Sequence, residues 1–261
     1  MLTHNPFADL FPAALMQGYV ILMVLLVLGS TIFDTIHKKS AKYFFQAAEK
    51  SKKSQTRSIS GGEKTSIAVK TAVNEVMLSS EFCNARRRIA HLLGMYGFVM
   101  FLITTIILIF SYPTSATPAP ALVTGLWHIG ALMVAVGGYW FWFFIRVDVA
   151  AEGNVWYKIM RADLFILTLL ATTTFALIWS YLQMNAGGLW TQIILALFIV
   201  SSTTLFGTVL WSKFAHMFFK PAAAFQKRGQ EADGSRANLP APADKPAQFG
   251  LGIKREPARH Y

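Results

Sequence analysis

Histidines are the residues of this sequence best suited to bind a metal or a redox cofactor. His37, His91 and His216 each stand at one end of a long apolar run, whereas His128 stands inside one. The other two histidines lie near the termini, and we assign them no role. An imidazole ligates haem iron or exchanges hydrogen bonds with a polar ring, so its depth in a membrane decides which partner it can reach.

Two of the histidines at run ends have the arrangement that a b-type haem requires. Low-spin haem iron takes one imidazole on each side of the porphyrin, and the preferred pair is His91 with His216. Gly94 and Gly97 follow His91 and would let a flat macrocycle approach the helix. His37 is the reserve ligand, and any metal bound by these residues would be the haem iron alone. The alternative is that these histidines, with nearby Lys and Arg, face lipid phosphates.

His128 lies too deep to share that iron. It precedes Arg146 by eighteen residues, which corresponds to about 27 Å of helix. One interpretation is contact with a quinone headgroup or ligation of a second haem. The other is a hydrogen bond between helices, with partners in the next two runs: Thr172–Thr174, Ser201, Ser202, Thr203 and Thr204.

The sequence also excludes several cofactors and partners. Cys83 is the only cysteine, so the chain alone cannot hold an iron–sulfur cluster, and without a CxxCH motif it cannot attach haem covalently. The net charge is +11, but the basic residues stand at the ends of the apolar runs. This distribution favours a membrane protein bordered by lipid over one that binds nucleic acid.

Five runs are long and apolar enough to cross a bilayer, which requires about 20 residues of helix. We therefore predict an all-α, polytopic membrane bundle. The expected crossings are residues 13–33, 92–110, 121–145, 164–184 and 189–212.

The positions of Lys and Arg predict the orientation. All 24 fall in three stretches, at residues 38–88, 146–161 and 213–259, which five crossings place on the same side. By the positive-inside rule these stretches are cytoplasmic, the N-terminus is periplasmic, and the expected location is the bacterial inner membrane.

Two polar segments lie outside the crossings. In the cytoplasmic loop 37–90 we expect an amphipathic helix, a flexible break and a surface helix. We divide the chain into a transmembrane domain, 1–221, and a tail, 222–261, whose polar composition predicts disorder.

Two stretches carry a family resemblance: CNARRRIAHLLGMYGF at residues 83–98 and WSKFAHMFFKP at 211–221. They resemble cytochrome b-like membrane subunits related to the nitrate reductase gamma subunit. Within that group the chain is most similar to the membrane subunits of dissimilatory sulfur metabolism, including the quinone-interacting oxidoreductase and DsrM types. The five-crossing layout fits best the stand-alone anchor of adenylylsulfate reductase (the AprM family). The resemblance covers about residues 80–221.

This resemblance implies a membrane anchor and electron-transfer subunit. It would link the quinone pool to a cytoplasmic iron–sulfur flavoenzyme, adenylylsulfate reductase, with His91 and His216 as haem ligands. Such a subunit is non-catalytic or quinone-reactive within an oxidoreductase complex. The alternatives are a cofactor-free anchor for the same partner, a subunit of a copper membrane monooxygenase, or a transporter.

Overall fold

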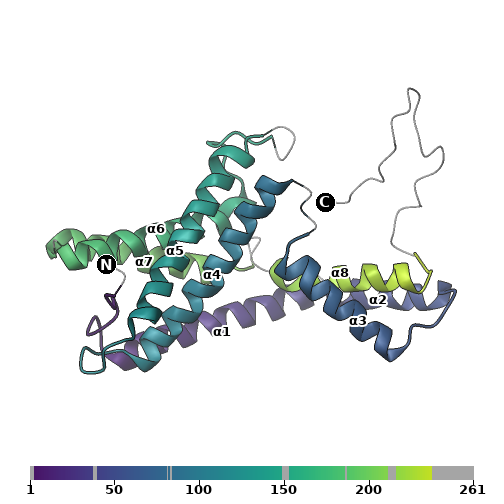
Figure 1. Ribbon diagram of the computed structural model, residues 1–261, viewed down its shortest axis with the longest axis horizontal. Coiled ribbons are helices and arrows are strands. Elements are labelled where there is room, and N and C mark those ends of the chain that lie inside the picture. The colour runs from purple at the N-terminus through teal and green to yellow at the C-terminus, as the bar shows by residue number, and fades with distance from the viewer. Residues whose placement is uncertain are drawn as a thin grey trace. The chain divides into compact units, whose positions relative to one another are not determined.

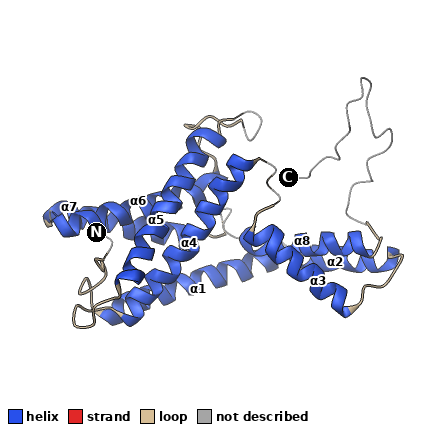
Figure 2. Ribbon diagram, in the orientation of Figure 1, coloured by secondary structure: helices blue, strands red, loops and turns tan. Residues whose placement is uncertain are grey.

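The computed structural model describes residues 3–37, 40–80, 82, 84–148, 153–185, 187–210 and 216–236. All regular structure in these residues is helical (Figure 2). Five helices are long and apolar enough to cross a membrane, which confirms the predicted number and the multi-pass architecture.

The membrane-spanning helices follow the predicted runs with small differences at their ends. They are α1 (Ala13–His37), α4 (Ala85–Ser111), α5 (Ala121–Trp140) with its π-helical continuation η2 (Phe141–Ile145), α6 (Leu164–Asn185) after a short 3-10 turn η3 (Arg161–Asp163), and α7 (Gly188–Gly207). Helix α4 begins seven residues before the predicted crossing, because a helix can continue beyond the apolar segment that lipid requires. The predicted fifth crossing reached residue 212, but α7 ends at Gly207 and residues 208–210 form a turn. Residues 211 and 212 lie outside the described residues.

The chain forms two compact units. Unit 1 comprises residues 1–34 and 89–215, and unit 2 comprises residues 35–88 and 216–261. The boundaries between them therefore fall at 34/35, near the end of α1, at 88/89, near the start of α4, and at 215/216. Our sequence-based division fell at residue 221.

The core of unit 1 is aromatic and lies near one end of its helices. Its buried members come from the N-terminal segment, α1, α4, α5, α6 and α7, and include Phe7, Phe101, Trp127, Trp179 and Phe198. Helices α5, α6 and α7 pack in chain order (Figure 1). Large apolar side chains on α1 and α7 are exposed, as expected for helices that face lipid.

Small residues let α4 and α5 approach each other at backbone distance. A Cβ added to Gly130 would lie 2.7 Å from the backbone N of Phe101, and one added to Gly97 would lie 2.8 Å from the carbonyl O of Gly130. Membrane helices use glycine in this way because close backbones gain van der Waals contact. The third crossing, α5, is thus packed closely against α4.

Unit 2 is helical as well. It contains α2 (Ser40–Ser54), α3 (Gly61–Thr71) with the π-helical η1 (Ala72–Met77), and α8 (His216–Ala232), and α8 packs against α3, η1 and α2. The helix–break–helix pattern expected for loop 37–90 is therefore present. The predicted disorder from residue 222 is wrong for residues 222–232, which are helical, while residues 237–261 lie outside the described residues.

Polar contacts explain why α8 is ordered despite its composition. The Asp233 backbone carbonyl accepts hydrogen bonds from the backbone N–H and hydroxyl of Thr56 at 2.9 and 3.1 Å. Ser51 donates to the Asp233 carboxylate at 3.2 Å, and Arg228 forms an ion pair with Glu75 at 2.5 Å. A segment whose composition predicts disorder is thus ordered by contacts with partners 153 to 182 residues away in the chain.

Candidate functional site

His91 lies on α4 and is partly buried in unit 1. The two glycines that follow it have different surroundings. A Cβ at Gly94 would meet nothing within 4 Å, whereas the position next to Gly97 is filled by Gly130 and Met133 of α5. Gly94 lies one turn from His91, so this part of α4 has room for a flat group. The expectation that Gly97 also faces a macrocycle is wrong, because α5 occupies that space.

The other two predicted haem ligands belong to unit 2. His37 is the last residue of α1 and is exposed, and Asp34, one turn earlier, is buried at 6% exposure in unit 1. His216 is the first residue of α8, but its side chain lies outside the described residues. Haem ligation by His91 with His216 or His37 stays a prediction.

His128 lies in the core of unit 1 and is 2% exposed. Its Nδ1 lies 2.7 Å from the carbonyl O of Thr124, one turn earlier on α5. Because a carbonyl only accepts, Nδ1 carries the proton. Nε2 lies 2.8 Å from the hydroxyl O of Ser180 on α6 and therefore accepts the proton of that hydroxyl. Both ring nitrogens therefore form hydrogen bonds within the protein. The hydrogen bond between helices is present, and its partner is Ser180.

An N-terminal segment closes the end of the bundle near His128. Phe7 contacts Trp127 and Trp179 edge-to-face, with ring centroids 5.6 Å apart in both pairs. The segment is tied down by hydrogen bonds from Gln183 to the Pro6 carbonyl and from Asn5 to the Tyr112 carbonyl.

Asp9 fixes the same segment to the loop after α4. Its backbone N–H donates to the Pro113 carbonyl at 3.0 Å, and its carboxylate accepts from the backbone N–H of Ser115 at 3.0 Å. Hydrogen bonds from the Ser115 side chain and backbone hold the pKa of the Asp9 carboxyl below its usual value.

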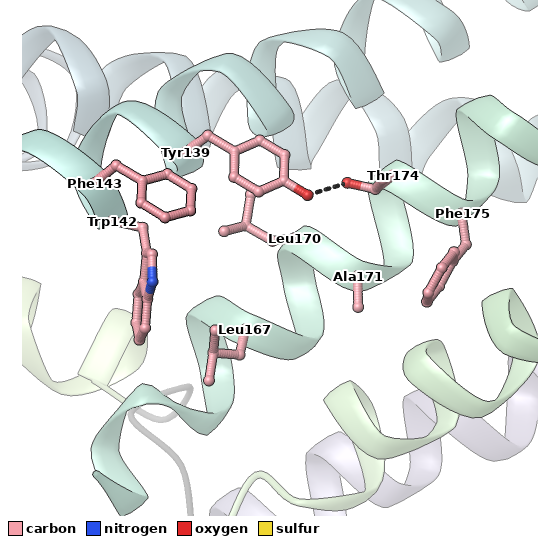
Figure 3. Close-up of a pocket in the computed structure, with 8 residues that line it drawn as sticks. All are labelled: Tyr139, Trp142, Phe143, Leu167, Leu170, Ala171, Thr174 and Phe175. Carbon is pink, nitrogen blue, oxygen red and sulfur yellow. Dashed lines mark hydrogen bonds between the residues drawn. The ribbon is translucent and has the colours of Figure 1, made fainter. Parts of the chain in front are cut away.

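A pocket of about 310 Å³ opens between α5–η2 and α6 (Figure 3). Its walls are apolar and largely aromatic: Tyr139, Trp142, Phe143, Leu167, Leu170, Ala171, Thr174 and Phe175. The Tyr139 and Phe143 rings are stacked, with an interplanar angle of 14°, and the Tyr139 hydroxyl lies 2.9 Å from the Thr174 hydroxyl. The pocket opens outward, since Tyr139 and Phe143 are 40% and 45% exposed.

Below this pocket, Arg146 is fully buried at the end of η2. Its guanidinium donates to the carbonyls of Val155 and Lys158, both at 2.7 Å, and to the Asp163 carboxylate at 2.5 Å. It also stacks over the Trp142 ring, with its central carbon 4.3 Å from the ring centroid. One side chain thus joins α5, the following loop and α6, and it holds Trp142 in the pocket wall.

Unit 2 carries most of the charge. Among its described residues, fourteen Lys and Arg stand against five Asp and Glu. Three of those acids, Glu49, Glu63 and Glu75, form ion pairs within the unit. Two cations lie over the Phe82 ring, with Arg87 and Lys220 at 5.3 and 5.4 Å from its centroid. The charge left over is strongly positive.

Two of these features were not predicted from sequence, the Arg146–Asp163 pair and the Tyr139–Thr174 pocket. A signal for the first was present, because Arg146 and Asp163 flank two consecutive crossings at their shared loop. The pocket had no comparable signal, since an aromatic run near a helix end is common at membrane interfaces.

Comparisons with protein-family models, with curated proteins and with solved structures gave no match. In the part of the chain that the structure describes, no cluster of three or more His, Cys, Asp or Glu side chains could hold a metal ion.

Proposed function

We propose that this chain is the membrane anchor and electron-transfer subunit of an oxidoreductase complex. In this proposal unit 1 lies in the bacterial inner membrane and exchanges electrons with the quinone pool. Unit 2 lies on the cytoplasmic side and docks an iron–sulfur flavoenzyme of sulfur metabolism, adenylylsulfate reductase. The resemblance of residues 80–221 to anchors of that enzyme supports the identity of the partner.

The observation that carries the proposal is the folded, strongly basic unit 2 attached to a membrane-spanning unit. A loop that only connected two crossings would not need a third helix from the far end of the chain to complete it. Surplus positive charge on a folded surface steers an acidic partner and makes the association salt-dependent. On α2, for example, Lys50 and Lys52 are exposed and are not neutralised by the nearby Lys53–Glu49 pair.

The electron-transfer part of the proposal rests on histidines. The open surface at Gly94 is compatible with a haem held by His91, with His216 as the second ligand and His37 as its substitute. When bound, a b-type haem supplies one-electron transfer, and the protein supplies the ligands and a low-dielectric surrounding. His128 stays a candidate for quinone contact or a second haem, but a ligand there must first displace the Ser180 hydroxyl.

A docking experiment tests the proposal. The full chain in detergent, or in nanodiscs, is immobilised and titrated with purified adenylylsulfate reductase at several salt concentrations. The charge-reversal variant Lys50→Glu/Lys52→Glu should lower the affinity for the reductase about tenfold or more at low salt. Raised salt should lower the affinity of the wild type. The matched control is Lys158→Glu/Arg161→Glu, which reverses two exposed charges in unit 1.

Equal losses of affinity in both variants would show a nonspecific charge effect, and absence of any binding by the folded wild type would overturn the proposed partner.

A cofactor-free anchor is the second candidate function. The filled space at Gly97 and the two hydrogen bonds of His128 favour it, because both remove room that a cofactor would use. This candidate predicts docking of the same partner without any haem absorbance.

A further inference from the structure

The pocket between α5 and α6 has the composition of a site for a small lipophilic molecule. Its volume of about 310 Å³ lies at the lower end of the range of ligand pockets, and such pockets combine apolar walls with few polar groups. Here the polar groups are two hydroxyls, those of Tyr139 and Thr174. Figure 3 shows this pair above Leu170, next to the Tyr139–Phe143 stack.

The hydroxyl pair has one donor to spare. Thr168, Thr172 and Thr173 each donate to a carbonyl one turn earlier in α6, but Thr174 has its hydrogen bond with Tyr139 instead. Two hydroxyls carry two protons, and the bond between them uses only one. Whichever residue donates, the other keeps an O–H group with no acceptor among the described residues. Since lipid offers no water at this depth, this O–H group can be satisfied only by a hydrogen-bond acceptor on a bound molecule.

The depth of the hydroxyl pair in the membrane limits which molecules can supply the acceptor. Tyr139 precedes Arg146 by seven residues, which corresponds to about 10 Å of helix. Phospholipid ester carbonyls border the hydrocarbon core, so they stay near the level of the helix end. A carbonyl that reaches the pair must belong to a molecule that is itself soluble in the hydrocarbon, and the stacked aromatic wall favours a flat ring.

A glycine, Gly138, leaves space for Leu170 at the floor of the pocket. Leu170 packs directly on the backbone at Gly138, where an added Cβ would lie 2.6 Å from Leu170 Cδ2. Because Gly138 has no side chain, Leu170 can withdraw from the pocket. Trp142 is held on the opposite side by the buried Arg146 guanidinium.

We propose that the α5–α6 pocket binds the ring of a membrane-soluble quinone, and that the Tyr139–Thr174 pair donates a hydrogen bond to one ring carbonyl. This inference deepens the proposed function, on which it rests for the redox role of the quinone, and it moves the quinone site from His128 to this pocket. The binding itself follows from the hydroxyl pair and the aromatic walls.

The test is a titration of the purified full chain with decylubiquinone, in which binding is measured by the quenching of tryptophan fluorescence. Decylbenzene, which has a ring and tail but no carbonyl, is the control ligand, and dioleoylphosphatidylglycerol tests a lipid ester. Tyr139→Phe should weaken decylubiquinone binding about tenfold, because Thr174 can then donate to its own helix and the spare donor is lost. Thr174→Ser should retain the affinity, and so should Tyr181→Phe, an exposed tyrosine of α6 that does not line the pocket.

A second variant, Ala171→Leu, fills the pocket without touching the hydroxyls and should abolish saturable quenching. Equal binding of decylbenzene, equal affinity in Tyr139→Phe, or displacement of the quinone by phosphatidylglycerol would each overturn the inference. The docking assay with the soluble reductase is run in parallel. Loss of docking with quinone binding retained contradicts the proposed partner alone, and the reverse result contradicts this pocket alone.

Discussion

Arg146 and Asp163 form a fully or almost fully buried ion pair next to membrane-spanning helices. Their side chains are 0% and 9% exposed. Burial of two charges is costly, so such a pair persists only when each partner is also satisfied by other groups. Two loop carbonyls accept hydrogen bonds from the Arg146 guanidinium, whose buried Nε has no partner among the described residues, and the Met160 backbone N–H donates to Asp163 at 2.8 Å.

Removal of one partner should therefore be expensive. We expect Asp163→Ala to lower the free energy of unfolding by about 3–5 kcal/mol, because the Arg146 charge would remain buried without its counter-charge. The measurement is the thermal midpoint in detergent, compared with Asp148→Ala, which removes the same charge at an exposed position. A loss no larger than that of the control would show that the Arg146 charge is solvated by other groups.

The chemistry of His128 could be predicted from sequence only in part. A polar ring within an apolar helix predicted a bond to the next helix, and this is correct, but the predicted threonines were in the wrong register. His128 lies seven residues after the start of α5, and Ser180 lies five residues before the end of α6. Consecutive spans run in opposite directions, so residues at matching distances from the same end meet. Counting from that end identifies Ser180, whereas Thr172–Thr174 lie about 10 Å deeper.

At the scale of elements, the contact of α4 with α5 depends on glycines at specific positions. We expect Gly130→Ala to destabilise the protein by about 1–3 kcal/mol, since its Cβ would collide with the Phe101 backbone, which cannot rotate away. Gly94→Ala on the same helix pair is the matched control. Nothing lies within 4 Å of its Cβ, and alanine should raise helix stability by about 0.8–1 kcal/mol. Equal thermal midpoints for the two variants would contradict the close packing of α4 against α5.

The N-terminal segment is an element without regular structure that is nevertheless part of the core. Phe7 is 4% exposed and fills the space between Trp127 and Trp179. Phe7→Ala should cost about 3–5 kcal/mol through the cavity that it leaves. Phe11→Ala, at a position 40% exposed, should change stability little. If unfolding followed by tryptophan fluorescence does not distinguish the two variants, Phe7 does not act as the predicted core residue.

Helices that cross lipid could be predicted because hydrophobicity alone fixes them. The five apolar runs needed no tertiary information, and each became a helix whose ends differ from the predicted bounds by no more than seven residues. Helix α8 could not be predicted in the same way. Its order depends on Asp233 meeting Thr56 and on Arg228 meeting Glu75, and contacts of such separation leave no local pattern in the sequence.

At the scale of the whole molecule, the distribution of Lys and Arg predicts the orientation in the membrane. All of them fall in stretches that five crossings place on one side. A green fluorescent protein fused after residue 261 should therefore fluoresce, and alkaline phosphatase fused after Thr117, beyond the second crossing, should be active in the periplasm. Phosphatase fused after Ser54 is the control and should be inactive. Active phosphatase at Ser54 would invert the topology and remove unit 2 from the cytoplasm.

The central claim is that the molecule transfers electrons and does not only hold an enzyme at the membrane. The most direct test is the visible spectrum of the purified full chain, reduced with dithionite minus oxidised in air, beside His91→Ala/His216→Ala and the control His4→Ala. We predict a b-type α-band in the wild type and in the control, and its loss in the double variant. A flat spectrum from a wild-type protein that is folded and still docks its partner would contradict electron transfer through haem and leave a cofactor-free anchor.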